Sequence, residues 1–152
     1  MKNEFITQIK EKLSQNIDQL TRQYKEGHTG TRTKFFILDN LIDNESVRSI
    51  YKQFDGDYWL LQDTFREKKL TYAKLDNLDP ILSNITEAFH DKEIVSLVSK
   101  ITGVNNLEYD PSLYAGGISK MRKGHFLNPH IDNSHDGGRK RYRRLNLLFY
   151  VS

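Results

Sequence analysis

The order of predicted elements along this sequence indicates an α+β fold. Apolar residues at helical spacing dominate the N-terminal part, and short strand-like runs separated by Gly, Asn and Pro follow from residue 116. A length of 152 residues fits one domain with its own hydrophobic core. We therefore expect a single domain over 1–152. Within it, 1–111 is mainly helical support with a few strands, and 112–152 holds the first strands of a β-structure.

Residues 4–25 are predicted to form one amphipathic helix, because their apolar side chains recur every three or four positions. The stripe consists of Phe5, Ile9, Leu13, Ile17, Leu20 and Tyr24. Gly27 and Gly30 then open a loop. The apolar run at 34–38 that follows predicts a buried strand.

A second helix is predicted after a turn at Asp39-Asn40. Asp43 or Asn44 can cap its N-terminus, and the helix would run to Phe54. The remaining strands are expected at 58–61, 70–75, 116–121, 126–127 and 145–151.

Two more helices follow from their end signals. Asp79 before Pro80 has the form of an N-cap and first helical residue, which predicts a helix to about Phe89. Residues 92–102 form the other, with Gly103 as its C-terminal stop.

The composition excludes several classes of protein. Eight Phe, eight Tyr and one Trp argue against disorder. No apolar run approaches the roughly 20 residues that span a bilayer, and the N-terminus lacks the apolar stretch of a signal peptide, which favours a cytoplasmic location. Because cysteine is absent, any metal must be held by His, Asp or Glu.

Positive charge gathers near the C-terminus. Residues 120–144 hold eight basic and two acidic residues, a net charge of +6 in a chain whose total is +3. Such a region attracts anionic substrates or nucleic acid, and Tyr142 within 139–144 offers a ring for base stacking. The plainer interpretation is a solvated loop. No standard nucleic-acid-binding module is recognisable, so nucleic acid is the less favoured partner.

His130 and Asp132 carry the most specific chemistry in the sequence. Residues i and i+2 of a strand point to the same side, so both side chains can face one ion. A His and a carboxylate supply two of the three ligands in the two-His-one-carboxylate set of non-haem iron. The alternatives are a hydrogen-bonded pair on a surface turn, and a local zinc or manganese site that adds His135.

Three runs near the C-terminus share a pattern with a known family. They are Tyr114-Ala115-Gly116-Gly117-Ile118-Ser119-Lys120-Met121, Gly124-His125-Phe126-Leu127-Asn128-Pro129-His130-Ile131-Asp132-Asn133 and Arg143-Arg144-Leu145-Asn146-Leu147-Leu148-Phe149-Tyr150-Val151. Together they resemble the Fe(II)- and 2-oxoglutarate-dependent dioxygenases, in particular the prolyl-4-hydroxylase-like branch. The resemblance covers residues 112 to 152, about a quarter of the chain.

The resemblance implies helices packed on an incomplete jelly-roll, the double-stranded β-helix of that family. It implies that His130 and Asp132 bind Fe(II), that Tyr150 contacts 2-oxoglutarate, and that Asn146 borders the same cavity. The implied reaction couples 2-oxoglutarate decarboxylation to substrate hydroxylation, with ascorbate as a candidate reductant. The substrate stays open.

The family's second His ligand and its 2-oxoglutarate-binding Arg would follow the position of Tyr150. We therefore expect this chain to be the N-terminal portion of a longer enzyme. A split enzyme completed by a partner chain and a degenerate remnant are the alternatives. The open strand edges of a partial barrel would favour self-association or pairing with another chain.

Overall fold

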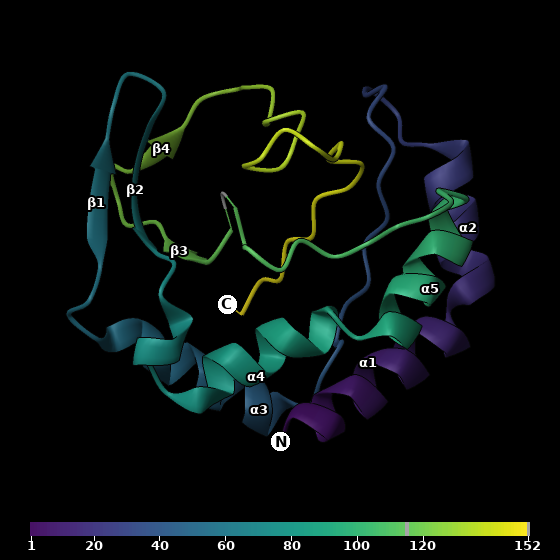
Figure 1. Cartoon of the computed structure of the whole chain (residues 1–152), viewed down its shortest axis with the longest axis horizontal. Helices are drawn as coiled ribbons and strands as arrows, with labels where there is room; N and C mark the ends of the chain where they lie inside the picture. The colour runs from purple at the N-terminus through teal and green to yellow at the C-terminus, as the bar shows by residue number, and fades with distance from the viewer. Residues whose placement is uncertain (115, 152) are drawn as a thin grey trace. The chain divides into compact units, whose positions relative to one another are not determined.

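The computed structural model describes residues 1–114 and 116–151 (Figure 1). In this part of the chain it has five α-helices and a small, open, four-stranded antiparallel sheet, which confirms the predicted α+β class. The sheet forms no jelly-roll within the described residues. Ala115, which belongs to the first of the three family-like runs, and Ser152 lie outside them.

The chain divides into two compact units. Unit 1 comprises Met1–Arg48 and Asn84–Tyr109, and unit 2 comprises Ser49–Ser83 and Asp110–Ser152. The boundaries fall within α3 (Asn44–Lys52) and α4 (Pro80–Phe89), so each of these helices contributes to both units. The prediction of one domain over 1–152 stays a prediction.

Unit 1 holds most of the buried apolar side chains. Its complete helices are α1 (Lys2–Gln15), α2 (Ile17–Glu26) and α5 (Lys92–Thr102), and α5 packs against both of the others. The buried apolar residues of this unit are Phe5, Ile9, Leu13, Leu20, Ile42, Ile85, Ala88, Ile94 and Ile101. The apolar stripes predicted on these helices therefore form the core of unit 1.

The predicted helix over 4–25 is broken at Asn16. The backbone of Asn16 has φ −110° and ψ 10°, and its N–H donates to the Leu13 carbonyl at 3.3 Å. Its side-chain Nδ2 donates to the Lys12 carbonyl at 2.8 Å. A short amide side chain competes for backbone carbonyls in this way, and the break is invisible in the apolar pattern because the stripe continues on both sides of it.

Residues 34–38 do not form the predicted strand. The Ile37 N–H donates to Gln23 Oε1 at 2.9 Å, and Gln23 Nε2 donates back to the Ile37 carbonyl at 3.4 Å. A side chain of α2 thus takes the place of a neighbouring strand, which satisfies the backbone without a sheet. The Ile37 side chain is exposed, so the prediction of a buried strand is wrong.

The three helices predicted from capping signals are confirmed. α3 is followed by a 3₁₀ turn, η1 (Gln53–Asp55), and a second one, η2 (Leu75–Asn77), precedes α4. Asp79 Oδ1 accepts a hydrogen bond from the Ile81 N–H at 2.9 Å, as expected of an N-cap. None of the helices in the described residues is long and apolar enough to cross a membrane.

The sheet belongs to unit 2. Its strands are β1 (Leu60–Asp63), β2 (Glu67–Tyr72), β3 (Ile118–Lys120) and β4 (Phe126–Leu127). β1 and β2 form an antiparallel hairpin in which Leu61 faces Leu70. β3 and β4 both pair with the other edge of β2, one after the other (Figure 1). Strands were expected in all four places, although β1 and β2 lie two and three residues away from the predicted starts.

β3 and β4 lie along the same edge of β2, and a loop separates them. Lys120 faces Leu70, and Phe126 faces Lys68. The chain therefore advances six residues while its partner changes by two, so that four residues are looped out. Each of the two strands is placed by its own pairing with β2.

Residues 145–151 are not the buried strand that their apolar run predicts. None of the described residues in this range is in a strand, and Leu147, Leu148 and Tyr150 are 56%, 72% and 77% exposed. A run of apolar residues becomes a buried strand only where a neighbouring strand and a covering layer are present. The described part of the chain provides neither for this segment.

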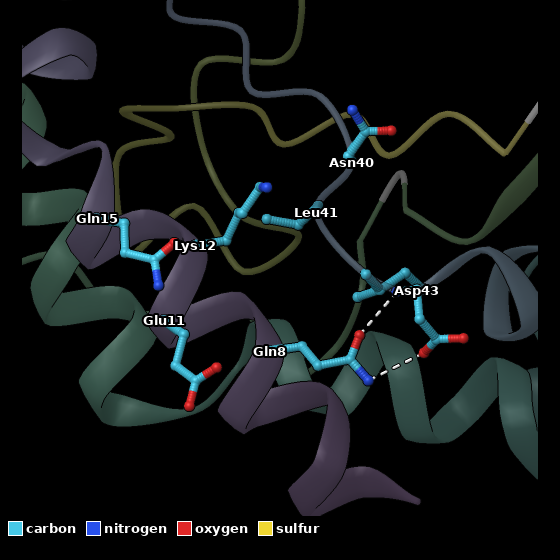
Figure 2. Close-up of a pocket in the computed structure, with 8 residues that line it drawn as sticks. Gln8, Glu11, Lys12, Gln15, Asn40, Leu41 and Asp43 are labelled. Atoms are coloured by element: carbon cyan, nitrogen blue, oxygen red, sulfur yellow. Dashed lines mark hydrogen bonds between the residues drawn. The ribbon is translucent and has the colours of Figure 1, made fainter.

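A shallow polar hollow of about 230 Å³ lies in unit 1 (Figure 2). Its lining comprises Gln8, Glu11, Lys12, Gln15, Asn40, Leu41, Ile42 and Asp43. Two hydrogen bonds join α1 to the residue before α3: Gln8 Nε2 donates to Asp43 Oδ2 at 2.9 Å, and the Asp43 N–H donates to Gln8 Oε1 at 2.8 Å (Figure 2). Gln8 and Asp43, on its rim, thus bond to each other.

Candidate metal centre

β4 leads the chain directly to His130 and Asp132. Asn128 follows β4 and continues its pairing, because its N–H donates to the Arg66 carbonyl and its Nδ2 to the Phe65 carbonyl, both at 2.9 Å. The pair therefore stands just beyond the end of the sheet.

The two side chains face each other. His130 Nε2 lies 3.2 Å from Asp132 Oδ1, and the side chains are 29% and 48% exposed. This is the juxtaposition expected of residues i and i+2 in an extended segment. It places one nitrogen and one oxygen of the right chemistry for a hard or borderline cation side by side.

The Asn128 carbonyl determines which ring nitrogen of His130 carries the proton in the neutral imidazole. His130 Nδ1 lies 2.8 Å from the Asn128 carbonyl oxygen, which can only accept, so Nδ1 carries a proton and donates. In a neutral imidazole the lone pair of Nε2 then points at the Asp132 carboxylate. A metal ion can bind both the Nε2 lone pair and Asp132 Oδ1, which lie 3.2 Å apart.

The spacing of the pair fits a metal ion. Adjacent ligands of an octahedral ion, at bond lengths of about 2.1 Å, lie about 3 Å apart. The Nε2–Oδ1 distance of 3.2 Å is close to that value. Metal-binding histidines also commonly donate their other N–H to a backbone carbonyl, as His130 does to Asn128.

The second oxygen of Asp132 is held by a side chain from a later segment. Asp132 Oδ2 accepts a hydrogen bond from Asn146 Nδ2. Asn146 Oδ1 in turn accepts one from Arg143 Nη2 at 2.6 Å. One carboxylate oxygen is thus occupied by an amide, and the other is turned toward His130.

The structure does not bring His135 to the pair. His135 Nδ1 lies 2.8 Å from Ser134 Oγ, and its ring packs against Tyr142 with centroids 4.4 Å apart. Over residues 1–114 and 116–151, no three His, Asp or Glu side chains gather as a metal-binding group. Metal binding by His130 and Asp132 therefore stays a prediction, as does a site that includes His135.

Asn146 and Tyr150 were predicted to border a bound 2-oxoglutarate. The structure joins Asn146 to Asp132 and leaves the Tyr150 side chain 77% exposed. Their contact with the co-substrate stays a prediction.

A basic hairpin, residues 134–143, connects Asp132 to Asn146. The Arg143 N–H donates to the Ser134 carbonyl at 2.9 Å and closes its base. The Asp136 carboxylate accepts from the backbone N–H groups of Lys140 and Arg141 at 2.8 and 3.2 Å. This acid is therefore engaged with the turn itself, and the basic residues of the tip lie at the surface.

Sequence reasoning missed the residues that support the pair. Asn128 orients His130, and Arg143 fixes Asn146. Their positions offered a weak signal: Asn128 precedes His130 by two residues, as Asp132 follows it by two, and Arg143 precedes Asn146 by three. Neither spacing is specific enough to identify a hydrogen-bond partner.

No protein-family model, curated protein or solved structure matches this chain.

Proposed function

We propose that this chain forms the iron-binding part of an Fe(II)- and 2-oxoglutarate-dependent oxygenase of the hydroxylase type. The observation that carries the proposal is the pair of facing acceptors, His130 Nε2 and Asp132 Oδ1, at 3.2 Å. His130 has its proton on the nitrogen that faces away from Asp132, so that one metal ion can bind both acceptors.

The proposed roles of the residues follow from their chemistry. His130 and Asp132 hold the metal, and Tyr150 and Asn146 border 2-oxoglutarate. When bound together, iron and 2-oxoglutarate supply the conversion of a substrate C–H and O₂ into C–OH, with 2-oxoglutarate leaving as succinate and CO₂. Ascorbate is the proposed accessory reductant. A third protein ligand and a cation for 2-oxoglutarate complete the centre, and we propose that both come from the rest of a jelly-roll to which this sheet contributes its first strands.

The basic hairpin is the proposed contact for an anionic substrate. It begins two residues after Asp132 and ends three residues before Asn146. The basic side chains of its tip, Arg139, Lys140 and Arg141, are exposed, while its one acid is engaged with backbone N–H groups. A positive surface next to the proposed metal ligands would raise the local concentration of an anion there.

We also propose that unit 2 pairs with another copy or another chain through its open sheet. β1 pairs only with β2 in the described residues, and its Leu60 and Leu61 are 61% and 55% exposed. An apolar strand with a free edge is a template for a further strand.

Binding of Mn²⁺, a redox-inert substitute for Fe(II), tests the proposed centre directly. Loss of the free-ion EPR signal gives the dissociation constant for the wild type and for His130→Ala and Asp132→Ala. We expect each variant to weaken binding at least about tenfold, since each removes one of only two identified ligands. His135→Ala is the matched control, with a nearby imidazole removed and affinity unchanged.

Adding 2-oxoglutarate separates an oxygenase from a plain metal site. The proposal expects 2-oxoglutarate to tighten Mn²⁺ binding, because the keto acid supplies further oxygen ligands, and expects Tyr150→Phe to reduce that effect. A His135→Ala loss equal to that of His130→Ala would instead favour the local zinc or manganese site. Equal affinity in all variants would leave the pair as a hydrogen-bonded surface turn.

One observation favours a second function, binding of nucleic acid by the basic hairpin. Tyr142 is 72% exposed and lies among the basic residues of the hairpin, as a stacking residue would. This function predicts oligonucleotide binding that weakens steeply with salt, that Tyr142→Ala reduces, and that neither Mn²⁺ nor 2-oxoglutarate affects.

A further inference from the structure

We infer that Asn146 is a positioning residue for the metal ligand Asp132, and that Arg143 fixes the orientation of its amide. This inference rests on the proposed metal centre. It gives Asn146 a task that differs from the co-substrate contact predicted for it, because the amide acts on the protein's own carboxylate.

A carboxylate that follows a strand end is free to rotate unless both of its oxygens are defined. In Asp132, Oδ2 accepts from Asn146 Nδ2, and Oδ1 lies 3.2 Å from His130 Nε2. The hydrogen bond from Asn146 therefore leaves one oxygen, on the His130 side, for a cation. Hydrogen-bonded carboxylate ligands of this kind are a general feature of metal sites.

The amide of Asn146 can face Asp132 in two ways, and only one is favourable. With Nδ2 toward the carboxylate it donates a hydrogen bond, whereas with Oδ1 toward it two acceptors meet. Arg143 resolves this choice, because a guanidinium can only donate and its Nη2 lies 2.6 Å from Asn146 Oδ1. The oxygen is thus held by Arg143 and the nitrogen is presented to Asp132.

The Arg143 backbone is fixed by the hairpin, and a carboxylate lies near enough to feel the charge of its side chain. Its N–H closes the base of the basic hairpin by donating to the Ser134 carbonyl at 2.9 Å. The pKa of the Asp110 carboxyl is lowered, first by the Ser112 hydroxyl and also by the positive charge of Arg143. Asp110 is fixed by the N–H groups of Ser112 and Tyr114 at 2.9 and 3.2 Å. A second chain segment therefore places a negative charge near Arg143.

Replacing Arg143 by an uncharged residue distinguishes two roles of this side chain, because the two roles predict opposite changes in cation affinity. If Arg143 acts only as a positive charge near the site, its loss should strengthen binding of a cation. If it orients Asn146, its loss should weaken binding. Arg144 is exposed and adjacent in sequence, so Arg144→Met removes the same charge without this hydrogen bond.

The experiment measures Mn²⁺ affinity by EPR in the wild type, Asn146→Leu, Arg143→Met and Arg144→Met. We expect Asn146→Leu and Arg143→Met to weaken binding about tenfold, with Arg144→Met unchanged or slightly tighter. The bound Mn²⁺ spectrum of Asn146→Leu should broaden, because the carboxylate is no longer held in one orientation. Asn146→Ser keeps a donor hydroxyl and should recover part of the affinity. Urea unfolding of the metal-free variants checks that the fold is retained.

The outcomes separate this inference from the proposed function. Failure of the wild type to bind Mn²⁺ overturns the metal centre and the inference with it. A wild type that binds, with Asn146→Leu and Arg143→Met at the same affinity, overturns the inference alone. Equal weakening by Arg143→Met and Arg144→Met would also overturn it, because Arg144 lacks the hydrogen bond to Asn146 and an effect independent of that bond would then explain the data.

Discussion

Among single side chains, Asp43 is the most firmly bonded carboxylate with a resolved pKa. Its Oδ1 accepts from the Ser46 N–H at 2.8 Å and its Oδ2 from the Ser46 hydroxyl at 2.7 Å, so that it caps α3. The Ser46 backbone and hydroxyl bonds, followed by the Gln8 amide, lower the pKa of Asp43 from 3.8 to about 2. The ionised form of Asp43 is therefore the one that the native state prefers.

This lowered pKa predicts a defined dependence of stability on pH. Because the pKa is lower in the native state than in the unfolded chain, the contribution of Asp43 is complete above about pH 4 and is lost as the pH falls toward 2. Asp43→Ala should lower the free energy of unfolding by about 1 kcal/mol at neutral pH, and the gap to wild type should narrow in acid. Urea denaturation at a series of pH values measures both.

Asp39→Ala is the control for that prediction. Asp39 is an exposed acid four residues earlier in the chain, and replacing it should cost little stability because it caps no helix. A gap for Asp43→Ala that stays constant down to pH 2 would contradict the role of the ionised cap.

The facing pair His130 and Asp132, and the residues bonded to it, show which side chains sequence reasoning can find. His130 and Asp132 were predicted to face each other, because strand geometry alone fixes i and i+2 on one side, and they do so at 3.2 Å. Asn146 belongs to the segment 145–151, which was predicted as a buried strand, and Arg143 lies two residues before that segment. The path of this segment depends on backbone hydrogen bonds that close the base of the basic hairpin, such as the one from the Arg143 N–H to the Ser134 carbonyl. No pattern of residues in the sequence predicts these bonds.

Among the helices and strands, those with a chemical end signal were predicted best. α4 and α5 have the expected bounds because Asp79-Pro80 marks the start of α4 and Gly103 the end of α5. The segment at 34–38 was wrongly predicted as a strand because apolar content alone does not show whether a partner strand exists. In this segment, the Gln23 side chain bonds to the Ile37 backbone where a partner strand would otherwise bond.

Gly117 is required where β2 and β3 approach each other. Its φ is 114°, and a Cβ at this position would lie 2.6 Å from the Tyr72 carbonyl oxygen and 3.0 Å from Ala73 Cα. Any residue with a Cβ is strained at this positive φ, and its Cβ would collide with the backbone of Tyr72 and Ala73. This glycine of the family-like run therefore has a structural explanation in the sheet itself.

Gly117→Ala should lower the free energy of unfolding by more than the roughly 1–2 kcal/mol of a positive φ alone. The matched control is Gly124→Ala, also in unit 2, where φ is 85° but nothing lies within 4 Å of the added Cβ. The difference between the two variants in urea denaturation isolates the collision with β2. Equal losses of stability in the two variants would show that the sheet accommodates the added Cβ of Gly117→Ala at no further cost in free energy.

For the chain as a whole, apolar burial is distributed unevenly. Of the thirteen buried apolar residues among the described positions, nine lie in unit 1, and the four in unit 2 are all on helical elements. Of the sixteen large apolar side chains that are exposed, thirteen lie in unit 2. The sheet thus lacks a buried face in the isolated chain.

Amide hydrogen exchange should reflect this difference. We expect slow exchange in α1, α2 and α5, whose backbone hydrogen bonds surround the core, and fast exchange in β1 to β4. Mass spectrometry of exchanged peptides measures both at low protein concentration. Protection of the sheet that grows with concentration would reveal self-association through its open edge, and strong protection at high dilution would contradict the exposed sheet.

The looped-out residues between β3 and β4 have a consequence for how this site tolerates change. β4 is aligned by its own bonds to β2, and Asn128 is tied to Phe65 and Arg66. The number of residues between β3 and His130 therefore does not fix where His130 and Asp132 lie. Insertions or deletions at Met121–Gly124 would alter the surface there while His130 and Asp132 kept their places, so the length of this loop can vary without disturbing the facing pair.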